Sequence, residues 1–195
     1  MKLCIIDTGC ANLASLKFCC GRLGHEALIT RDLKELEMAD KLFLPGVGTA
    51  RNVMDSLRRL DLVSFLQKNK KPLLGICLGM QILGIFSEEL RQETLGIIPF
   101  KTYEFKKKDG FTLPHMGWND IKSSHPLFKG LDGAYFYFVH SFCVDINDYS
   151  IASCEYSQIF SAAVAMDNFY GVQFHPERSA EAGEILIKTF IKDIG

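Results

Sequence analysis

The chain has 195 residues, 48% of them hydrophobic and 23% charged, a balance typical of a globular domain that can bury a substantial core. We therefore expect a single domain over residues 1–195. The formal net charge of -1 gives no electrostatic basis for binding nucleic acid or an acidic membrane surface, so neither is an expected partner.

The seven cysteines are odd in number and lack paired C-x-x-C spacing. This pattern argues against a disulfide framework and a zinc cluster, and it fits a reducing cytoplasm. The N-terminal residues reach Asp7 too soon to contain a signal-peptide core. The longest uncharged stretch, residues 72–87, is shorter than the roughly 20 residues that a membrane-spanning helix needs. We expect a cytoplasmic protein with no membrane span, no metal and no other cofactor.

In the first half, apolar runs alternate with segments of helical period, as in βα units that build a mainly parallel sheet. Asn12 can cap the first helix and Gly24 can end it. The predicted strands are 3–6, 27–30, 42–44 and a segment ending just before Cys77, and the predicted helices are 13–23 and 53–60.

The second half consists of short aromatic or β-branched segments separated by turns, which favours an added antiparallel portion. Ser179 is the expected N-cap of a last helix with one apolar stripe. The chain as a whole predicts an α/β fold, with a mostly parallel central sheet flanked by helices. The short strands expected in this half lie at 103–105, 121, 135–139, 151–156, 162–165 and 169–174.

The run GICLGMQ at residues 75–81 follows an apolar segment and opens a helix-like stretch. A strand that feeds a helix through a tight turn, with glycine two residues to either side, lifts the central side chain out of the backbone. Cys77 occupies that position, where the helix N-terminus and a nearby imidazolium would favour its thiolate. The alternative is a small buried hydrophobic residue, as we expect of most other cysteines in the chain.

A base and a group to orient it occur near the end of the chain, in the segment QFHPE at residues 173–177. Side chains at i and i+2 of an extended chain point the same way, so His175 and Glu177 would lie together. Pro176 biases His175 towards that extended geometry. A nucleophile, a base and an orienting carboxylate can thus be assembled in the order Cys77, His175, Glu177.

The glycine-bearing loop LPGVG at residues 44–48 follows a predicted strand. It lacks both the G-x-x-x-x-G-K-S/T pattern of a phosphate loop and the third glycine of a dinucleotide fingerprint. We interpret the backbone at Val47 and Gly48 as a source of N–H groups for a developing oxyanion, with the Leu78 amide as the other donor. The alternative is an ordinary tight turn.

In these residues the chain resembles the class I glutamine amidotransferases, and within them the glutaminase subunits of imidazole glycerol phosphate synthases. The Cys-His-Glu set and the Pro-Gly-x-Gly loop are shared across the class. Much of the family opens with Asp-Tyr-Gly-x-Gly-Asn, from which Thr8 and Ala11 depart. The narrower resemblance is carried by DTGCANL (7–13), PHMGWN (114–119), YFVHSF (137–142) and GVQFHPERS (171–179).

The resemblance implies a glutaminase in which Cys77 is the nucleophile, His175 the base and then the acid, and Glu177 the group that holds the imidazole tautomer. It also implies a glutamine-binding site in which Glu89 recognises the amino group of the bound glutamine. Without the resemblance, Gln81 is a helix-surface amide and Glu89 a solvated charge. The implied substrate-binding residues are Gly46, Gln81 and Glu89, together with the backbone of Ser141 and Phe142.

The implied partner is a (β/α)8-barrel cyclase, which would use the ammonia in a heterodimer to form imidazole glycerol phosphate and aminoimidazole carboxamide ribotide. Asn12 and Trp118 would lie at this interface, and His115 would have a structural or interfacial role. Three alternatives stay open: a paralogue that feeds another acceptor, a γ-glutamyl peptidase on the same scaffold, and a binding module with a decayed site.

Overall fold

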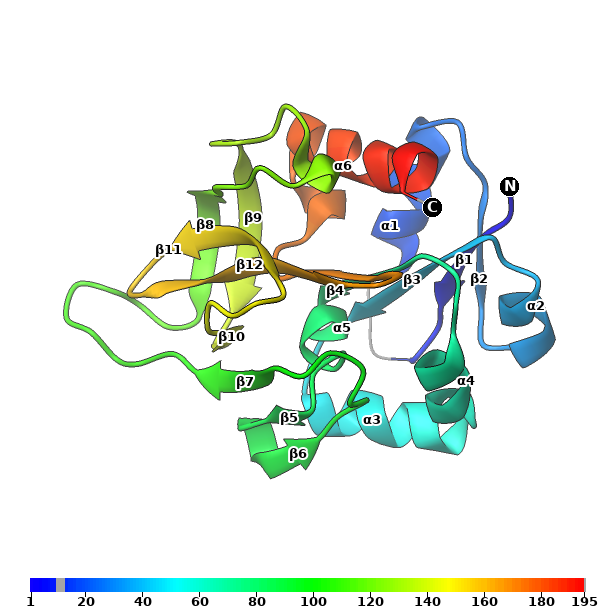
Figure 1. Ribbon diagram of the computed structural model, residues 1–195, viewed down its shortest axis with the longest axis horizontal. Helices are drawn as coiled ribbons and strands as arrows, with labels where there is room; N and C mark the ends of the chain where they lie inside the picture. The colour runs from blue at the N-terminus through cyan, green and yellow to red at the C-terminus, as the bar shows by residue number, and fades with distance from the viewer. Residues whose placement is uncertain (10–12, 195) are drawn as a thin grey trace.

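A central sheet runs through the computed structural model, which describes residues 1–9 and 13–194, and seven strands of these residues form it (Figure 1). In spatial order the strands are β11 (Ser150–Glu155), β12 (Ile159–Met166), β13 (Phe169–Val172), β4 (Leu73–Cys77), β3 (Lys41–Gly46), β1 (Leu3–Ile6) and β2 (Ala27–Thr30). The five strands from β13 to β2 are parallel, whereas β12 and β11 are antiparallel additions at one edge.

Helices cover both faces of this sheet (Figure 1). The apolar sides of α1 (Leu13–Arg22) and α6 (Ala180–Asp193) pack on one face, in a core that includes Phe43 and Phe190. A second core holds α2 (Leu33–Glu37), α3 (Ala50–Arg59) and α4 (Leu62–Lys68) on the other face. Parallel strands covered on both faces are apolar throughout, and β1, β3 and β4 are fully buried.

Two smaller β structures extend from the carboxyl side of the central sheet. A second sheet contains β10 (Phe142–Val144), β7 (Lys101–Glu104), β5 (Phe86–Ser87) and β6 (Gln92–Glu93), in that order. A separate ladder pairs β8 (His115–Asp120) with β9 (Tyr135–His140). The remaining helix, α5 (Leu78–Gln81), follows β4 directly. Among the described helices, none is long and apolar enough to cross a membrane.

The predicted α/β fold with an antiparallel second half is confirmed. Several details differ from the prediction, among them the following three. The periodicity did not identify α2 or α4, which are only five and seven residues long. The helix after Cys77 ends at Gln81, because the chain then turns so that the Ile85 N–H reaches the Phe100 carbonyl. The strand expected at Ile121 lies just before it, in β8. Asn12, the predicted cap, lies outside the described residues.

Candidate active site

The turn between β4 and α5 places Cys77 in a rare backbone conformation, with φ 55° and ψ -111°. A positive φ in a residue with a side chain costs on the order of 1–3 kcal/mol and persists only where the surroundings enforce it. Here the enforcing contact is close packing of α5 on the sheet. A Cβ added at Gly79 would lie 1.7 Å from the Leu44 carbonyl oxygen, and one at Gly75 would lie 2.7 Å from the Gly79 oxygen. The two flanking glycines are therefore required.

The sheet topology brings His175 to this turn from the far end of the chain. Strand β13 lies parallel to β4 with Val172 opposite Ile76, so the residues after Val172 leave the sheet beside Cys77. Strand β9 then holds the segment, because the His175 N–H donates to the Tyr137 carbonyl at 2.9 Å. Two segments distant in sequence thus meet at the carboxyl edge of the sheet.

Ser179 also holds this segment, and it is the N-cap residue of the last helix as predicted, although its hydroxyl has another use. The residue does precede α6, but its side chain makes no capping hydrogen bond. Instead, Oγ donates to the His175 carbonyl at 2.7 Å and accepts from the Tyr137 N–H at 3.0 Å. The hydroxyl is used to fix the backbone of His175.

His175 and Glu177 are in contact, but not through the geometry expected from an extended chain. His175 itself is extended, as Pro176 requires, yet Pro176–Arg178 forms a 3₁₀ turn. This turn folds the carboxylate back, so that Glu177 Oε1 lies 2.9 Å from His175 Nδ1. Both side chains are 8% exposed. The prediction of same-side i and i+2 residues in a strand was wrong, although the contact itself is present.

The electrostatics of His175 fit an imidazolium that lies between the Cys77 sulfur and the Glu177 carboxylate. Burial lowers the pKa of His175, but the Cys77 sulfur and the Glu177 carboxylate outweigh burial and raise the pKa to about 10. Its other nitrogen, Nε2, is buried and has no hydrogen-bond partner among the described residues. A buried ring nitrogen without a partner calls for an explanation, and a reacting group beside Cys77 would supply it.

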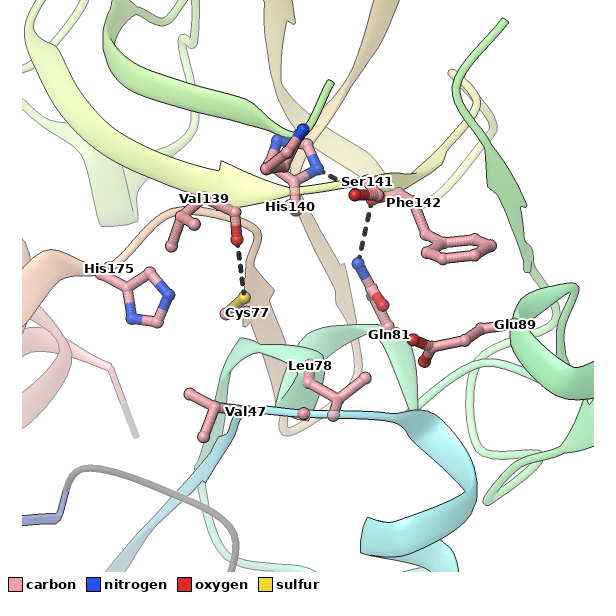
Figure 2. Close-up of a pocket in the computed structure, with 12 residues that line it drawn as sticks. Val47, Cys77, Leu78, Gln81, Glu89, Val139, His140, Ser141, Phe142 and His175 are labelled. Atoms are coloured by element: carbon pink, nitrogen blue, oxygen red, sulfur yellow. Dashed lines mark hydrogen bonds between the residues drawn. The ribbon is translucent and has the colours of Figure 1, made fainter. Parts of the chain in front are cut away.

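A cavity of about 320 Å³ opens beside these residues, and His175 lies next to Cys77 at one end of it (Figure 2). Gly46 does not line this cavity. It lines a neighbouring one of about 100 Å³ that also contacts His175 and Glu177. The residues around the larger cavity are Val47, Gly48, Cys77, Leu78, Gln81, Glu89, Pro114, Val139, His140, Ser141, Phe142 and His175.

The glycine-bearing loop lies directly beside Cys77. Gly46 is opposite Cys77 in the β3–β4 ladder, so Val47 and Gly48 continue past the sulfur. Gly48 has φ +89°, a conformation that glycine adopts at little cost. Val47 and Leu78 lie on the same side of the cavity, below Cys77 in Figure 2. The loop and the first turn of α5 are thus adjacent.

Gln81 and Glu89 occupy the other end of the cavity. Gln81 Nε2 lies 3.0 Å from both the Phe142 carbonyl and Gln173 Oε1, and Gln173 Nε2 lies 3.8 Å from Cys77 Sγ. Glu89 Oε2 accepts from the Ala50 N–H at 2.7 Å, at the start of α3. Sequence reasoning missed Gln173. Its position two residues before His175, in a segment already assigned to the site, was the available signal.

Trp118 lies on β8, outside the cavity, and 49% of its surface is exposed. Its ring contacts Tyr137 edge-on at 6.1 Å, and Met116 beside it is 64% exposed. Large apolar side chains that stay exposed in this way are typical of an interaction surface. Asn12, the other predicted interface residue, lies outside the described residues.

Comparison with known proteins now bears on this site. The model of the class I glutamine amidotransferase family matches residues 4–193. The chain belongs to the class I glutamine amidotransferase family. The family predicted from the sequence is confirmed, and with it an enzyme class that uses a Cys-His-Glu triad. We assign Cys77, His175 and Glu177 to this triad and refer to them below as the triad.

Two curated relatives of this glutamine amidotransferase match it over nearly its whole length. Imidazole glycerol phosphate synthase subunit HisH 2 of Campylobacter jejuni strain RM1221 is 72% identical over 195 residues, which cover 100% of both chains. Imidazole glycerol phosphate synthase subunit HisH of Vibrio cholerae is 52% identical over 197 residues, covering 96% of this chain and 97% of the relative.

Solved structures share the fold at low identity. A structure described as a glutamine amidotransferase is 17% identical with a TM-score of 0.76, and the match covers 97% of each chain. The structure of PurLQS from Thermotoga maritima is 16% identical with a TM-score of 0.73 and full coverage of both chains.

Within residues 1–9 and 13–194, no group of three or more His, Cys, Asp or Glu side chains could hold a metal ion.

Proposed function

We propose that this chain is the glutaminase subunit of an imidazole glycerol phosphate synthase and acts in histidine biosynthesis. The observation that carries the proposal is that Cys77 and His175 line one cavity and Glu177 contacts His175, in a chain that is 72% identical over its whole length to a subunit of that enzyme. The reaction is hydrolysis of L-glutamine to glutamate and ammonia, which passes to a cyclase subunit.

The first step is attack of the Cys77 thiolate on the side-chain amide carbon of glutamine. His175 holds the proton as an imidazolium, which its raised pKa favours. Negative charge develops on the amide oxygen. We assign its stabilisation to backbone N–H groups at Val47, Gly48 and Leu78, which lie beside the sulfur. One such donor is typically worth on the order of 10²- to 10³-fold in rate.

The second half of the reaction depends on His175. It donates its proton to the departing nitrogen, so that ammonia leaves and a γ-glutamyl thioester forms on Cys77. The neutral imidazole then takes a proton from water, which attacks the thioester and releases glutamate. Glu177 keeps Nδ1 protonated through the 2.9 Å hydrogen bond, so Nε2 is the atom that exchanges protons.

Glutamine fits the cavity with its amide at Cys77 and its backbone groups towards Gln81 and Glu89. We assign recognition of the amino group to the Glu89 carboxylate and of the carboxylate to the backbone of Ser141 and Phe142. Gly46 has an indirect part: a Cβ there would lie 3.1 Å from the Gly79 nitrogen, so its lack of a side chain lets the loop approach α5.

The product requires a partner. Ammonia released into neutral water would be protonated and diluted, and protonation removes the lone pair that an acceptor needs. We propose that a (β/α)8-barrel cyclase docks on the side of the molecule that bears Trp118, and that Asn12 is a further residue of this interface. It receives ammonia directly and forms imidazole glycerol phosphate and aminoimidazole carboxamide ribotide in the cytoplasm. We also propose that the isolated chain is nearly inactive until docking organises the oxyanion donors near Val47.

The test is to purify the chain with and without a candidate cyclase and to measure glutamate release and glutamine-dependent imidazole glycerol phosphate formation. We expect both activities in the complex, little glutaminase activity in the chain alone, and neither in a Cys77→Ala complex. Equal glutaminase rates with and without the cyclase would refute activation by docking. Amine release from γ-glutamyl peptides by the lone chain would favour a peptidase. Glutamate release without the imidazole product would favour another acceptor.

A further inference from the structure

Two buried histidines lie next to the cavity but do not belong to the triad. His115 on β8 and His140 on β9 are opposite each other in their ladder and are 2% and 6% exposed. Nδ1 of His115 lies 3.0 Å from Nε2 of His140. The His115 ring also stacks on Tyr156 at 4.0 Å and on Phe138 at 4.9 Å, so aromatic packing fixes the plane of the ring.

The hydrogen bonds of this pair have only one consistent direction. His140 Nδ1 lies 2.8 Å from the Phe142 carbonyl, which can only accept, so Nδ1 carries the proton. Burial lowers the pKa of His140 to about 3 and that of His115 to about 4, so both rings are neutral. Nε2 of His140 must then accept from His115 Nδ1, and His115 Nε2 accepts from the Asn119 amide at 3.0 Å.

The Phe142 carbonyl is where this chain of donors meets the substrate cavity. It accepts from His140 at 2.8 Å and from Gln81 Nε2 at 3.0 Å, as the dashed lines in Figure 2 show. Gln81 Nε2 also donates to Gln173 Oε1, which leaves the Gln173 amide nitrogen facing Cys77 Sγ. Both N–H groups of Gln81 are therefore used, and its oxygen is the atom left to accept from a substrate ammonium.

We propose that His115 and His140 are positioning residues of the glutaminase reaction, which hold the Phe142 carbonyl and, through it, the Gln81 carboxamide in the orientation that binds glutamine. This inference rests on the proposed function, because it concerns the same cavity. It assigns a role to the His-Met-Gly-Trp segment that the triad does not explain. Neither ring contacts the reacting atoms, so the pair acts on substrate binding rather than on the chemical step.

The test is steady-state glutaminase kinetics of the complex with the cyclase for two variants of one residue. His140→Leu removes the donor to Phe142, whereas His140→Asn keeps an N–H near the position of Nδ1. We expect His140→Leu to raise the KM for glutamine about tenfold or more, as for loss of a buried hydrogen bond, with a smaller change in kcat. We expect His140→Asn to stay within about threefold of wild type. His25→Leu, at a histidine remote from the cavity, should leave both constants unchanged.

A second measurement does not depend on the variants folding. Nitrogen chemical shifts of the wild-type protein should show His115 and His140 both neutral and protonated at Nδ1. A proton on His140 Nε2 would overturn the proposal, and so would a His140→Leu complex with wild-type KM. Equal KM increases in His140→Leu and His140→Asn would also overturn the proposal, because they would show that the two histidines have only a structural role. A wild-type complex that fails to hydrolyse glutamine would instead refute the proposed function itself.

Discussion

Replacement of Gly79 by alanine tests why the turn at Cys77 requires glycine. The added Cβ would lie 1.7 Å from the Leu44 carbonyl oxygen, about 1.3 Å short of the 3.0 Å that real Cβ atoms keep. Leu44 is in the centre of a buried strand, so α5 must move instead. Overpacking of this kind costs roughly 1–3 kcal/mol. Because Cys77 lies two residues away, a shift of about 1 Å should also lower kcat/KM roughly 100-fold.

The assay combines urea unfolding of the chain with glutaminase turnover of its complex with the cyclase. The matched control is Gly21→Ala in α1, where an added Cβ meets nothing within 4 Å. Since alanine suits a helix interior better than glycine, this control should keep full activity and gain up to about 1 kcal/mol. A Gly79→Ala protein with wild-type turnover and an unchanged urea midpoint would refute the packing argument for the turn.

Three further predictions concern Glu177, His115 and Trp118. Glu177→Gln removes one of the groups that raise the pKa of His175 to about 10. Turnover of the complex should therefore fall by up to roughly 10⁴-fold, and the pH above which turnover declines should become lower. An unchanged pH profile of turnover would contradict this prediction. Since burial lowers the pKa of His115 from 6.5 to about 4, the unfolded chain takes up a proton below pH 6.5 that the folded protein does not. The free energy of unfolding should therefore fall between pH 6.5 and 4, less so in His115→Phe, and flat urea midpoints would count against it. Trp118→Ala should weaken cyclase binding by about 2 kcal/mol in calorimetry with little change in Tm, whereas Ile146→Ala, at a similarly exposed residue, should not.

Much of the first half of the fold could be predicted because its signals are local. The strands at 3–6 and 27–30 match β1 and β2 to the residue. The helix expected at 53–60 begins three residues after the start of α3 (Ala50–Arg59) and ends one residue beyond it. Alternation of apolar runs and turn residues is a property of neighbouring residues. The short helices α2 and α4 escaped detection because five to seven residues contain too few turns for a helical period to emerge.

Part of the candidate site could likewise be predicted from local sequence, and part of it could not. Cys77 could be identified because the need for glycine at positions 75 and 79 is visible in the run itself. The contact of His175 with Glu177 was expected, yet the conformation that makes it was not, because Pro176 is compatible with both a strand and a 3₁₀ turn. The sequence indicates His140 only as part of a family segment, because its partner, His115, is 25 residues away.

The sequence by itself determined the chemical identity of the site: a cysteine in a glycine-flanked turn, a histidine with a nearby carboxylate, and the family to which they point. Only the tertiary structure decided how these groups act on one another. Parallel pairing of β13 with β4 brings residues 77 and 175 together. The neighbouring Cys77 sulfur and Glu177 carboxylate then make His175 basic, whereas burial keeps His140 neutral. The physical reason is that pKa values and hydrogen-bond directions depend on solvent exclusion and on partners far apart in the chain, which local residue spacing does not encode.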